Sequence, residues 1–314
     1  MATTADGIGN SATGIKGIHH VSISVADLDR TATFFEKATT LPRAIDSSFS
    51  GKGLADSTPL ASAVIKGPNA HIELMQFADS KPGLVPVEGP GFTHICFQSP
   101  TTTGMYNKFK AAGATAVSWG DEPIDLGGYG VQYAYLRDAD NAMYEVEHVD
   151  RPPFEGEVWI GHVALVSYDI DRLVEFYKTL FEIEPYRRAN KATGPRIEEV
   201  TGLKDARMRA AWFNVANMVL EIWEFVTPAT PTHSAERPFE QAGFNKFAFE
   251  VTNIEREITR LSDAGVQFVS EVLTTPIGLE VYALDPDGNR FSLVQLNDDT
   301  HSIDQLKHIS WQTA

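Results

Sequence analysis

The sequence predicts an α+β protein in which one unit, a strand and a helix followed by further strands, occurs four times. The first observation behind this prediction is that segments of the chain repeat one another at matching positions. The second is that each copy opens with alternating, strand-like residues and continues with a helical pattern. The third is that proline and glycine gather between the copies.

The repeat is visible when HVSISVADLDRTATFF, which begins at His20, is laid over HVALVSYDIDRLVEFY, which begins at His162. GFTHICFQ from Gly91 corresponds in the same way to GFNKFAFE from Gly243. Near the ends of the second and fourth copies, DADNAMYEVE corresponds to DPDGNRFSLVQ. We therefore expect modules near residues 15–78, 90–150, 157–226 and 243–298.

Each module contains one amphipathic helix that follows its first strand. Asp27 and Asp169 are placed to cap the free N–H groups at the start of the first and third helices. In the third module the i, i+3, i+4, i+7 pattern is formed by Ile170, Leu173, Val174, Tyr177, Leu180 and Phe181. The later strands are expected at HIELMQF, YAYLRD, MYEVEHV, MVLEIWEF and VYALD, which are rich in β-branched and aromatic residues.

The joins between modules suggest where the domains divide. The segments DSKPGLVPVEGPG, VDRPPFEG and VTPATPTHSAERP separate successive modules. We expect a flexible tail at residues 1–13, a metal-bearing N-terminal domain at 14–150, a metal-free C-terminal domain at 157–299 and a second tail at 300–314. The two longer joins could also act as lids.

Composition and charge narrow the function classes. The chain has 314 residues, 43% of them hydrophobic, which is enough for two domains with their own cores. Its net charge of -16 disfavours nucleic acid and anionic membranes as partners, because both would repel the protein. One cysteine, no signal-peptide pattern and no long apolar run favour a cytoplasmic location. Small molecules remain the expected partners.

Strand alternation places four potential metal ligands on one side of the predicted sheet. His20, Glu73, His94 and Glu145 each point away from the apolar residues of their own strand. Two imidazoles and two carboxylates suit Zn²⁺, Ni²⁺, Co²⁺, Mn²⁺ or Fe²⁺. We therefore expect these residues to bind one divalent ion and to leave a position open for substrate.

The segments HHVSISVADLDRTATFF, HIELMQF, GFTHICF and DADNAMYEVE resemble the vicinal oxygen chelate superfamily, over residues 14–297. That superfamily includes glyoxalase I, methylmalonyl-CoA epimerase, extradiol dioxygenases, and the fosfomycin and bleomycin resistance proteins. The resemblance implies βαβββ modules paired into two cup-shaped half-barrel domains, with metal ligands on the first and last strands of each module. In this sequence those strands supply His20, Glu73, His94 and Glu145.

The second half departs from this pattern. The places equivalent to the four expected ligands hold His162, Glu221, Lys246 and Ser292. A lysine beside a carboxylate can stand where a cation stood. We therefore expect the C-terminal cup to lack a metal and Lys246 to pair with Glu221.

The two-His, two-Glu set resembles glyoxalase I and related isomerases and epimerases. The resemblance implies proton transfer through a metal-stabilised enediolate, with Glu145 as the base and Glu73 as its counterpart. Tyr135 stands where extradiol dioxygenases carry a tyrosine near the metal, but Tyr282 occupies the same place in the half expected to lack a metal. The alternatives are an extradiol-type ring-cleaving dioxygenase, which needs three open metal positions, and a non-catalytic binding or resistance protein.

Several properties stay open at this stage. The sequence does not identify the substrate, the metal, or whether a thiol cosubstrate is used. Four modules can complete two cups within one chain or exchange modules between chains, so a homodimer is also allowed.

Overall fold

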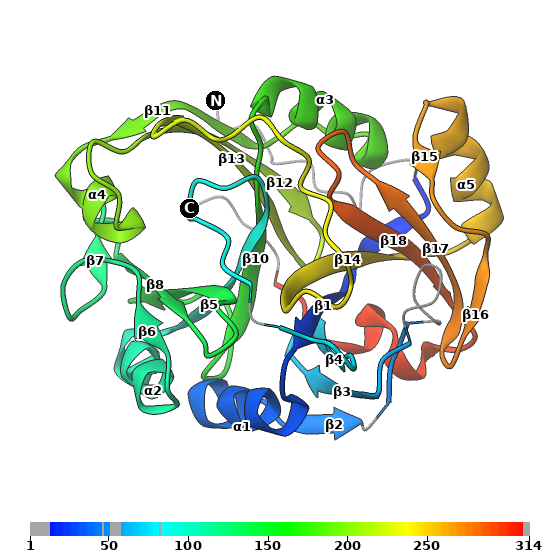
Figure 1. The fold of residues 1–314 in the computed structure, drawn as a ribbon, viewed down its shortest axis with the longest axis horizontal. Helices are drawn as coiled ribbons and strands as arrows, with labels where there is room; N and C mark the ends of the chain where they lie inside the picture. The colour runs from blue at the N-terminus through cyan, green and yellow to red at the C-terminus, as the bar shows by residue number, and fades with distance from the viewer. Residues whose placement is uncertain (1–12, 46, 51–57, 82, 310–314) are drawn as a thin grey trace.

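The computed structural model describes residues 13–45, 47–50, 58–81 and 83–309. Residues 1–12 of the expected N-terminal tail and residues 310–314 of the expected C-terminal tail lie outside the described residues. The described part contains the four modules in the expected order (Figure 1). None of its helices is long and apolar enough to cross a lipid bilayer.

The elements of each module follow the predicted pattern of one strand, one helix and further strands, but module two also has the short helix η2 and module three a second helix, α4. Module one comprises β1 (Ile15–Val25), α1 (Leu28–Thr39), β2 (Arg43–Ile45), β3 (Ala61–Lys66) and β4 (His71–Gln76). Module two comprises β5 (Gly91–Pro100), η2 (Thr101–Thr103), α2 (Met105–Ala111), β6 (Thr115–Ala116), β7 (Ile124–Asp125), β8 (Val131–Arg137) and β9 (Met143–Val149). Module three comprises β10 (Trp159–Val166), α3 (Ile170–Phe181), β11 (Arg187–Thr193), α4 (Pro195–Thr201), β12 (Arg207–Val215) and β13 (Met218–Thr227). Module four comprises β14 (Gly243–Val251), α5 (Ile254–Asp263), β15 (Gln267–Phe268), β16 (Leu273–Thr275), β17 (Gly278–Leu284) and β18 (Arg290–Leu296).

The helix caps lie where the sequence places them. The Asp27 carboxylate accepts a hydrogen bond from the backbone N–H of Arg30, and Asp169 accepts one from Arg172. These bonds satisfy donors that the first turn of a helix otherwise leaves unpaired. The apolar residues expected on the inner face of α3 are all buried, so this helix packs its predicted face against the sheet.

Modules pair in a nested order. β1 pairs antiparallel with β14, so modules one and four share one nine-stranded sheet, the 1+4 sheet. β5 pairs antiparallel with β10, so modules two and three share the other, the 2+3 sheet. Figure 1 shows the 2+3 sheet in the left half of the molecule and the 1+4 sheet in the right half.

This pairing corrects the expected domains 14–150 and 157–299, because each sheet combines one module from the N-terminal half of the chain with one from the C-terminal half. The repeat itself explains the error. Every module begins with a strand whose free edge can pair with the first strand of another module, and the similar sequences do not say which one.

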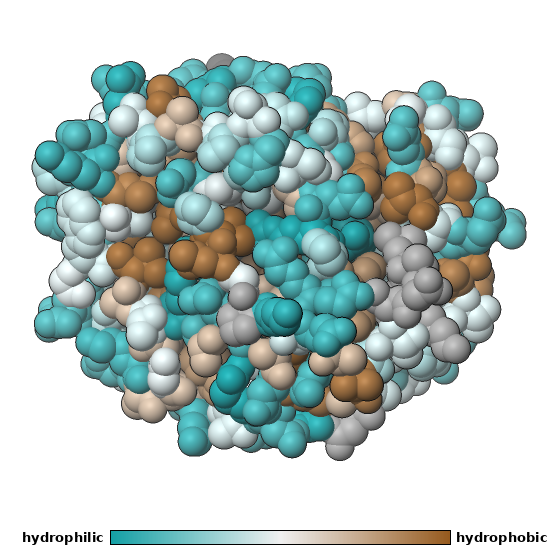
Figure 2. Space-filling view, viewed as in Figure 1, coloured by the Kyte–Doolittle hydropathy of each residue, from teal (hydrophilic) through white to brown (hydrophobic). Residues whose placement is uncertain are grey.

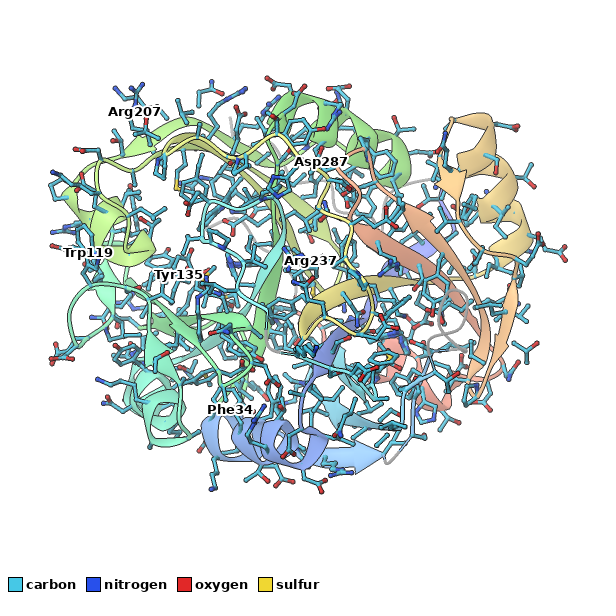
Figure 3. All side chains as sticks on the ribbon, in the orientation of Figure 1. Phe34, Trp119, Tyr135, Arg207, Arg237 and Asp287 are labelled. Atoms are coloured by element: carbon cyan, nitrogen blue, oxygen red, sulfur yellow. The ribbon has the colours of Figure 1, made fainter. Side chains whose placement is uncertain are left out.

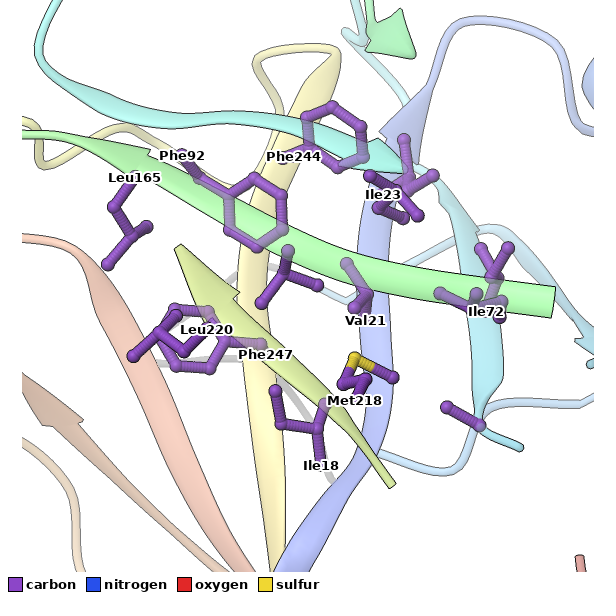
Figure 4. Packing of buried hydrophobic residues seen from close by; sticks show 14 of the residues in the cluster. Ile18, Val21, Ile23, Ile72, Phe92, Leu165, Met218, Leu220, Phe244 and Phe247 are labelled. Carbon is purple, nitrogen blue, oxygen red and sulfur yellow. The ribbon is translucent and has the colours of Figure 1, made fainter. Parts of the chain in front are cut away.

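One apolar core joins the two sheets. Each sheet turns its apolar side chains toward the helices and toward the other sheet, as the alternation in β1 predicts for Val21 and Ile23. Phe92 on β5 stacks on Phe244 on β14 with 4.6 Å between ring centroids. Figure 4 shows this contact among the buried residues. The polar side chains of the first strands consequently face away from the core, into the two cups.

The C-terminal segment is ordered beyond the expected boundary at residue 299. Two short turns, η3 (Asp299–His301) and η4 (Ile303–Gln305), follow β18. Ile303 is buried, and Ser302 donates a hydrogen bond to Glu250 with 2.6 Å between the oxygens. Residues 300–305 are therefore part of the folded domain rather than of a tail.

Candidate metal centre

Four strands of the 2+3 sheet bring four potential metal ligands together in two neighbouring rows of paired residues. In one row His94 on β5 and Glu221 on β13 lie two strands apart. In the next row Glu145 on β9 and His162 on β10 lie two strands apart. Residues in one row share a face, and residues two apart on a strand share it as well. All four side chains therefore enter the same cup.

The centre of this arrangement is kept open by two small residues. Ala164 on β10 lies between His94 and Glu221, and Cys96 on β5 lies between Glu145 and His162. A larger side chain at either place would fill the space in which the four ligand atoms meet. Small residues at these two positions therefore let the longer side chains converge above the sheet.

The ligand atoms of the four residues form a compact cluster. His162 Nε2 lies 2.8 Å from Glu145 Oε2 and 3.2 Å from Glu221 Oε2. His94 Nε2 lies 3.1 Å from His162 Nε2, 3.3 Å from Glu145 Oε2 and 3.7 Å from Glu221 Oε2. All four side chains are buried.

These distances fit a bound divalent ion. Ligand atoms at the corners of a tetrahedron with bonds of about 2.1 Å are about 3.4 Å apart, close to the separations observed here. Glu221 Oε2 is buried and has no hydrogen-bond partner among the described residues. A buried carboxylate oxygen without a hydrogen bond is costly, and a cation held between the four residues would satisfy it.

Charge within the cluster is balanced between imidazole and carboxylate. Burial alone would lower the pKa of His162, but Glu221 and Glu145 outweigh it and raise that pKa to about 9. Burial likewise opposes ionisation of Glu145, but its hydrogen bonds to His162 and His94 hold its pKa well below the usual range. The residues are thus arranged to stabilise positive charge among them.

Two further polar residues adjoin the centre. Burial and then the charge of Glu147 raise the pKa of Cys96 well above its usual value, so its thiol keeps its proton and is a poor ligand. Burial and the neighbouring Glu145 raise the pKa of Glu147 to about 7. Gln98 donates a hydrogen bond to Glu147 with 2.6 Å between Nε2 and Oε2. Glu147 is therefore a second carboxylate at the cup wall rather than a member of the four-residue cluster.

Of the four residues expected to share one ion, the structure brings together only His94 and Glu145. His20 on β1 and Glu73 on β4 belong to the 1+4 sheet. The expectation that all four converge is therefore corrected, and the cause is the nested pairing of the modules. His162 and Glu221 complete the cluster in their place.

The sequence did contain the signal for His162 and Glu221. Both stand at positions that the repeat aligns with expected ligands, but the expected division into halves places them in a cup without a metal. The expected pairing of Lys246 with Glu221 is also wrong. Lys246 lies in the 1+4 sheet, where its Nζ is 2.6 Å from Glu280 Oε1.

Tyr135 lies inside the 2+3 cup, on β8, directly across from Glu145. Its ring centroid is 5.1 Å from that of His94, and its side chain is buried. Figure 3 labels Tyr135 in the half of the molecule that the 2+3 sheet forms. Its counterpart Tyr282 on β17 lies across from Ser292. The tyrosine thus recurs in both cups, as the repeat predicts.

A cavity of about 430 Å³ opens onto three of the four ligands, Glu145, His162 and Glu221. Its walls are mainly apolar and aromatic, and Figure 2 shows apolar surface gathered in the same left half of the molecule. The larger wall residues are Leu126, Val131, Tyr133, Tyr186, Ile197, Met208, Trp212 and Trp223. A cavity of this size suits a small ligand.

A third residue extends the row of His94 and Glu221 across the cup. Trp212 on β12 pairs with Glu221, and Arg187 on β11 pairs with Trp212. Trp212 Nε1 donates a hydrogen bond to Glu221 Oε1 at 2.5 Å, and the Arg187 guanidinium lies 5.0 Å from the centroid of the indole ring. Neighbouring strands are about 4.8 Å apart, so the backbone of Arg187 lies roughly 10 Å from that of Glu221.

Known proteins agree with this architecture. No curated protein sequence matches this chain. The structure is similar to glyoxalase I from Zea mays, with a TM-score of 0.63 and 18% identity over 89% of this chain and 92% of that one. A variant of the same protein matches 93% of this chain and 95% of its own at the same TM-score and identity. A candidate dioxygenase from Bacillus subtilis subsp. subtilis has a TM-score of 0.59 and 12% identity over 91% of this chain and 87% of its own.

Because these solved structures share only 12–18% sequence identity with this chain, their similarity establishes its fold alone. The sequence also matches a family model in two segments, residues 17–146 and 159–293. These segments take in the four clustered ligands and the repeated modules. This chain belongs to the Glyoxalase/Bleomycin resistance protein/Dioxygenase superfamily.

Proposed function

We propose that this protein is a divalent-metal-dependent lyase, isomerase or epimerase of the glyoxalase-like type that acts on a small molecule in the 2+3 cup. His94, Glu145, His162 and Glu221 would hold the ion. The single observation that supports this proposal most strongly is the convergence of their ligand atoms, with Glu221 Oε2 buried and without a hydrogen bond among the described residues. An ion that accepts five or six ligands would bind these four donors and keep one or two positions open for substrate.

The proposed chemistry is movement of a proton between adjacent carbons. A divalent ion, when bound, polarises a substrate carbonyl and so acidifies the neighbouring C–H bond. Glu145 on β9 and Glu221 on β13 flank the two strands that carry the imidazoles. One carboxylate can therefore take a proton from the substrate carbon while the other faces it from a different strand. We assign Glu145 as the base. Glu221 takes the role of its counterpart on the opposite side, which the sequence analysis expects of Glu73.

The remainder of the cup suggests what kind of molecule binds. Apolar and aromatic walls favour a substrate with an apolar body. Its two neighbouring oxygens would lie at the four-residue cluster. Arg187, which pairs with Trp212 at the far end of this row, would then donate hydrogen bonds to a carboxylate or similar anion.

The experiment that tests this function combines metal analysis with hydrogen exchange. Purified protein is loaded with Zn²⁺, Ni²⁺, Co²⁺, Mn²⁺ or Fe²⁺ and incubated in D₂O with 2-hydroxyacetophenone, or with methylglyoxal in the presence and absence of glutathione. Metal-dependent exchange or rearrangement, followed by NMR, supports proton transfer. Oxygen consumption with catechols would instead support a dioxygenase, and failure to bind any of the metals would support a binding protein.

A further inference from the structure

The 1+4 sheet contains a second centre with the same layout as the first. His20 and Ala248 lie in one row with Ser292, while Ser22 lies between Glu73 and Lys246 in the next row. Matched by register, His20 takes the place of His162 and Glu73 takes the place of Glu221. Lys246 stands in place of His94, and Ser292 stands in place of Glu145. We call His20, Glu73, Lys246 and Ser292 the 1+4 centre.

We propose that the Lys246 ammonium is the permanent cation of the 1+4 centre and takes the position that, under the proposed function, a metal ion would take in the 2+3 centre. Lys246 Nζ lies 3.0 Å from His20 Nε2, 2.6 Å from Glu280 Oε1 and 3.4 Å from Ser292 Oγ. Lys246 and these three partners are all fully buried. The ammonium thus contacts His20 Nε2. The counterpart of this atom in the other cup is His162 Nε2, which faces Glu145 and Glu221.

The protonation state of His20 follows from a chain of hydrogen bonds. The backbone oxygen of His301 can only accept, so His19 Nε2, 2.9 Å away, must donate to it. In a neutral imidazole His19 Nδ1 then accepts, and His20 Nδ1, 2.8 Å away, donates to it. His20 Nε2 is left with a lone pair, which accepts from Lys246. Burial lowers the pKa of His19 to about 4 and lowers that of His20 well below its usual value, consistent with two neutral rings.

This chain means that the nitrogen of His20 that could bind a metal is already occupied. A bulge in β1 between Ile18 and His20 brings the adjacent imidazoles to each other. Among the described residues no lysine contacts His162 Nε2, the counterpart nitrogen in the 2+3 centre, which lies beside Glu145, Glu221 and His94 Nε2.

The two carboxylates near the Lys246 ammonium, Glu280 and Glu73, already have other partners. Glu280 reaches Lys246 from β17, the strand that neighbours Ser292, and it accepts a hydrogen bond from Tyr282 with 3.0 Å between the oxygens. Glu73 accepts hydrogen bonds from the hydroxyls of Ser22, Ser48 and Ser50 and from the N–H groups of Phe49 and Ser50. Glu73 therefore has few lone pairs left for a metal, and Glu280 already binds a cation.

The test is the metal stoichiometry of the full-length chain, stripped with a chelator and titrated with Co²⁺. We expect one tightly bound equivalent for the wild type, none of comparable affinity for His94→Ala, and two for the double variant Lys246→His/Ser292→Glu. Combining the double variant with His94→Ala should leave one equivalent at the 1+4 centre. The visible spectrum of Co²⁺ reports whether each ion has protein ligands.

Two results would overturn the proposal. One is a second equivalent in the wild type that disappears in His20→Ala. The other is a double variant that melts like the wild type but still binds a single ion.

Lys246→Met provides a second readout if the double variant does not fold. Removing the cation leaves Glu280 buried beside an apolar chain, so the melting temperature should fall by roughly 5–10 °C. Glu280→Gln in the same background should recover part of that loss. An unchanged melting temperature in Lys246→Met would show that the ammonium does not hold this centre together.

Discussion

His162 and His20 occupy the same position in the two sheets, yet His162 Nε2 faces two carboxylates and His20 Nε2 faces an ammonium. The two residues therefore form a matched pair for testing which cup binds a metal. His162→Ala removes one of four ligands and should weaken metal binding by more than the roughly 100-fold that loss of a ligand's supporting partner causes. His20→Ala should leave the stoichiometry and the affinity unchanged. Equilibrium dialysis with Co²⁺ measures both, and equal losses in the two variants would contradict the assignment.

Glu145→Gln tests the proposed base. An amide cannot take up a proton, so turnover should fall by roughly 10²–10⁴. The amide oxygen can still contact a metal, and the variant should therefore bind the ion more weakly than the wild type but still bind it. Rates are compared at saturating metal, so that weaker binding is not mistaken for loss of chemistry. Full turnover in the metal-loaded variant would remove Glu145 from this role.

Trp212→Phe tests the support of a ligand. The indole N–H is hydrogen bonded to Glu221 Oε1 and fixes the orientation of that carboxylate. Its loss should weaken metal affinity by roughly 10- to 100-fold. Trp223→Phe is the control, because Trp223 Nε1 lines the same cup but has no hydrogen-bond partner among the described residues. Equal effects of the two substitutions would mean that ring packing, and not the hydrogen bond, is what matters.

Arg187→Gln tests the far end of the cup. With Zn²⁺ bound, 3,4-dihydroxyphenylacetate offers two neighbouring oxygens and a distant carboxylate, whereas 4-ethylcatechol lacks the carboxylate. The substitution should raise the dissociation constant of the anionic probe about tenfold and leave that of the neutral probe unchanged. Arg188→Gln is the control, because Arg188 points to the other face and pairs with Asp171. Calorimetry measures all four combinations, and equal affinities in both arginine variants would contradict the role of Arg187.

Glu73 should make stability depend on pH in the acid range. Burial alone would raise its pKa, but the Lys246 ammonium and the hydrogen bonds from Ser22, Ser48 and Ser50 outweigh burial and lower it. The folded protein therefore binds fewer protons than the unfolded chain, and this stabilisation is present above about pH 4.5 and is lost as pH falls through the depressed pKa. Glu73→Gln should lower the free energy of unfolding at pH 7 by about 2–4 kcal/mol.

Urea unfolding at several pH values measures this effect. The wild type should lose more stability between pH 6 and pH 3.5 than Glu73→Gln does. Parallel pH curves for the two proteins would mean that Glu73 is not responsible for the dependence.

The modules and their caps were predictable because they depend on local patterns. Alternation in β1 and the cap at Asp169 are properties of a few neighbouring residues, and the structure confirms them. The choice of partner for each module is not local. The first strands of all four modules have similar sequences and free edges, so the sequence alone did not show that β1 pairs with β14.

The pairing of the modules determines which of the predicted site residues lie together. His94 and Glu145 belong to one module, so they stay together whichever module it pairs with. His20 and Glu73 also stay together, but they lie opposite Lys246 instead of opposite His94. The substitution of lysine and serine at 246 and 292 was visible in the sequence, and its meaning became clear only when the partner strand was known.

The nested order has a consequence for how the chain acquires its shape during synthesis on the ribosome. Modules two and three can complete their sheet as soon as β13 has emerged, because everything that sheet requires lies between β5 and β13. Module one emerges first, and β4 can pair with one edge of β1 at once, but the other edge must wait for β14, more than 200 residues later in the chain. The earliest segment to be made is thus among the last to be finished, and the contact of Phe34 with Phe109 gives α1 an apolar neighbour on α2 during that interval.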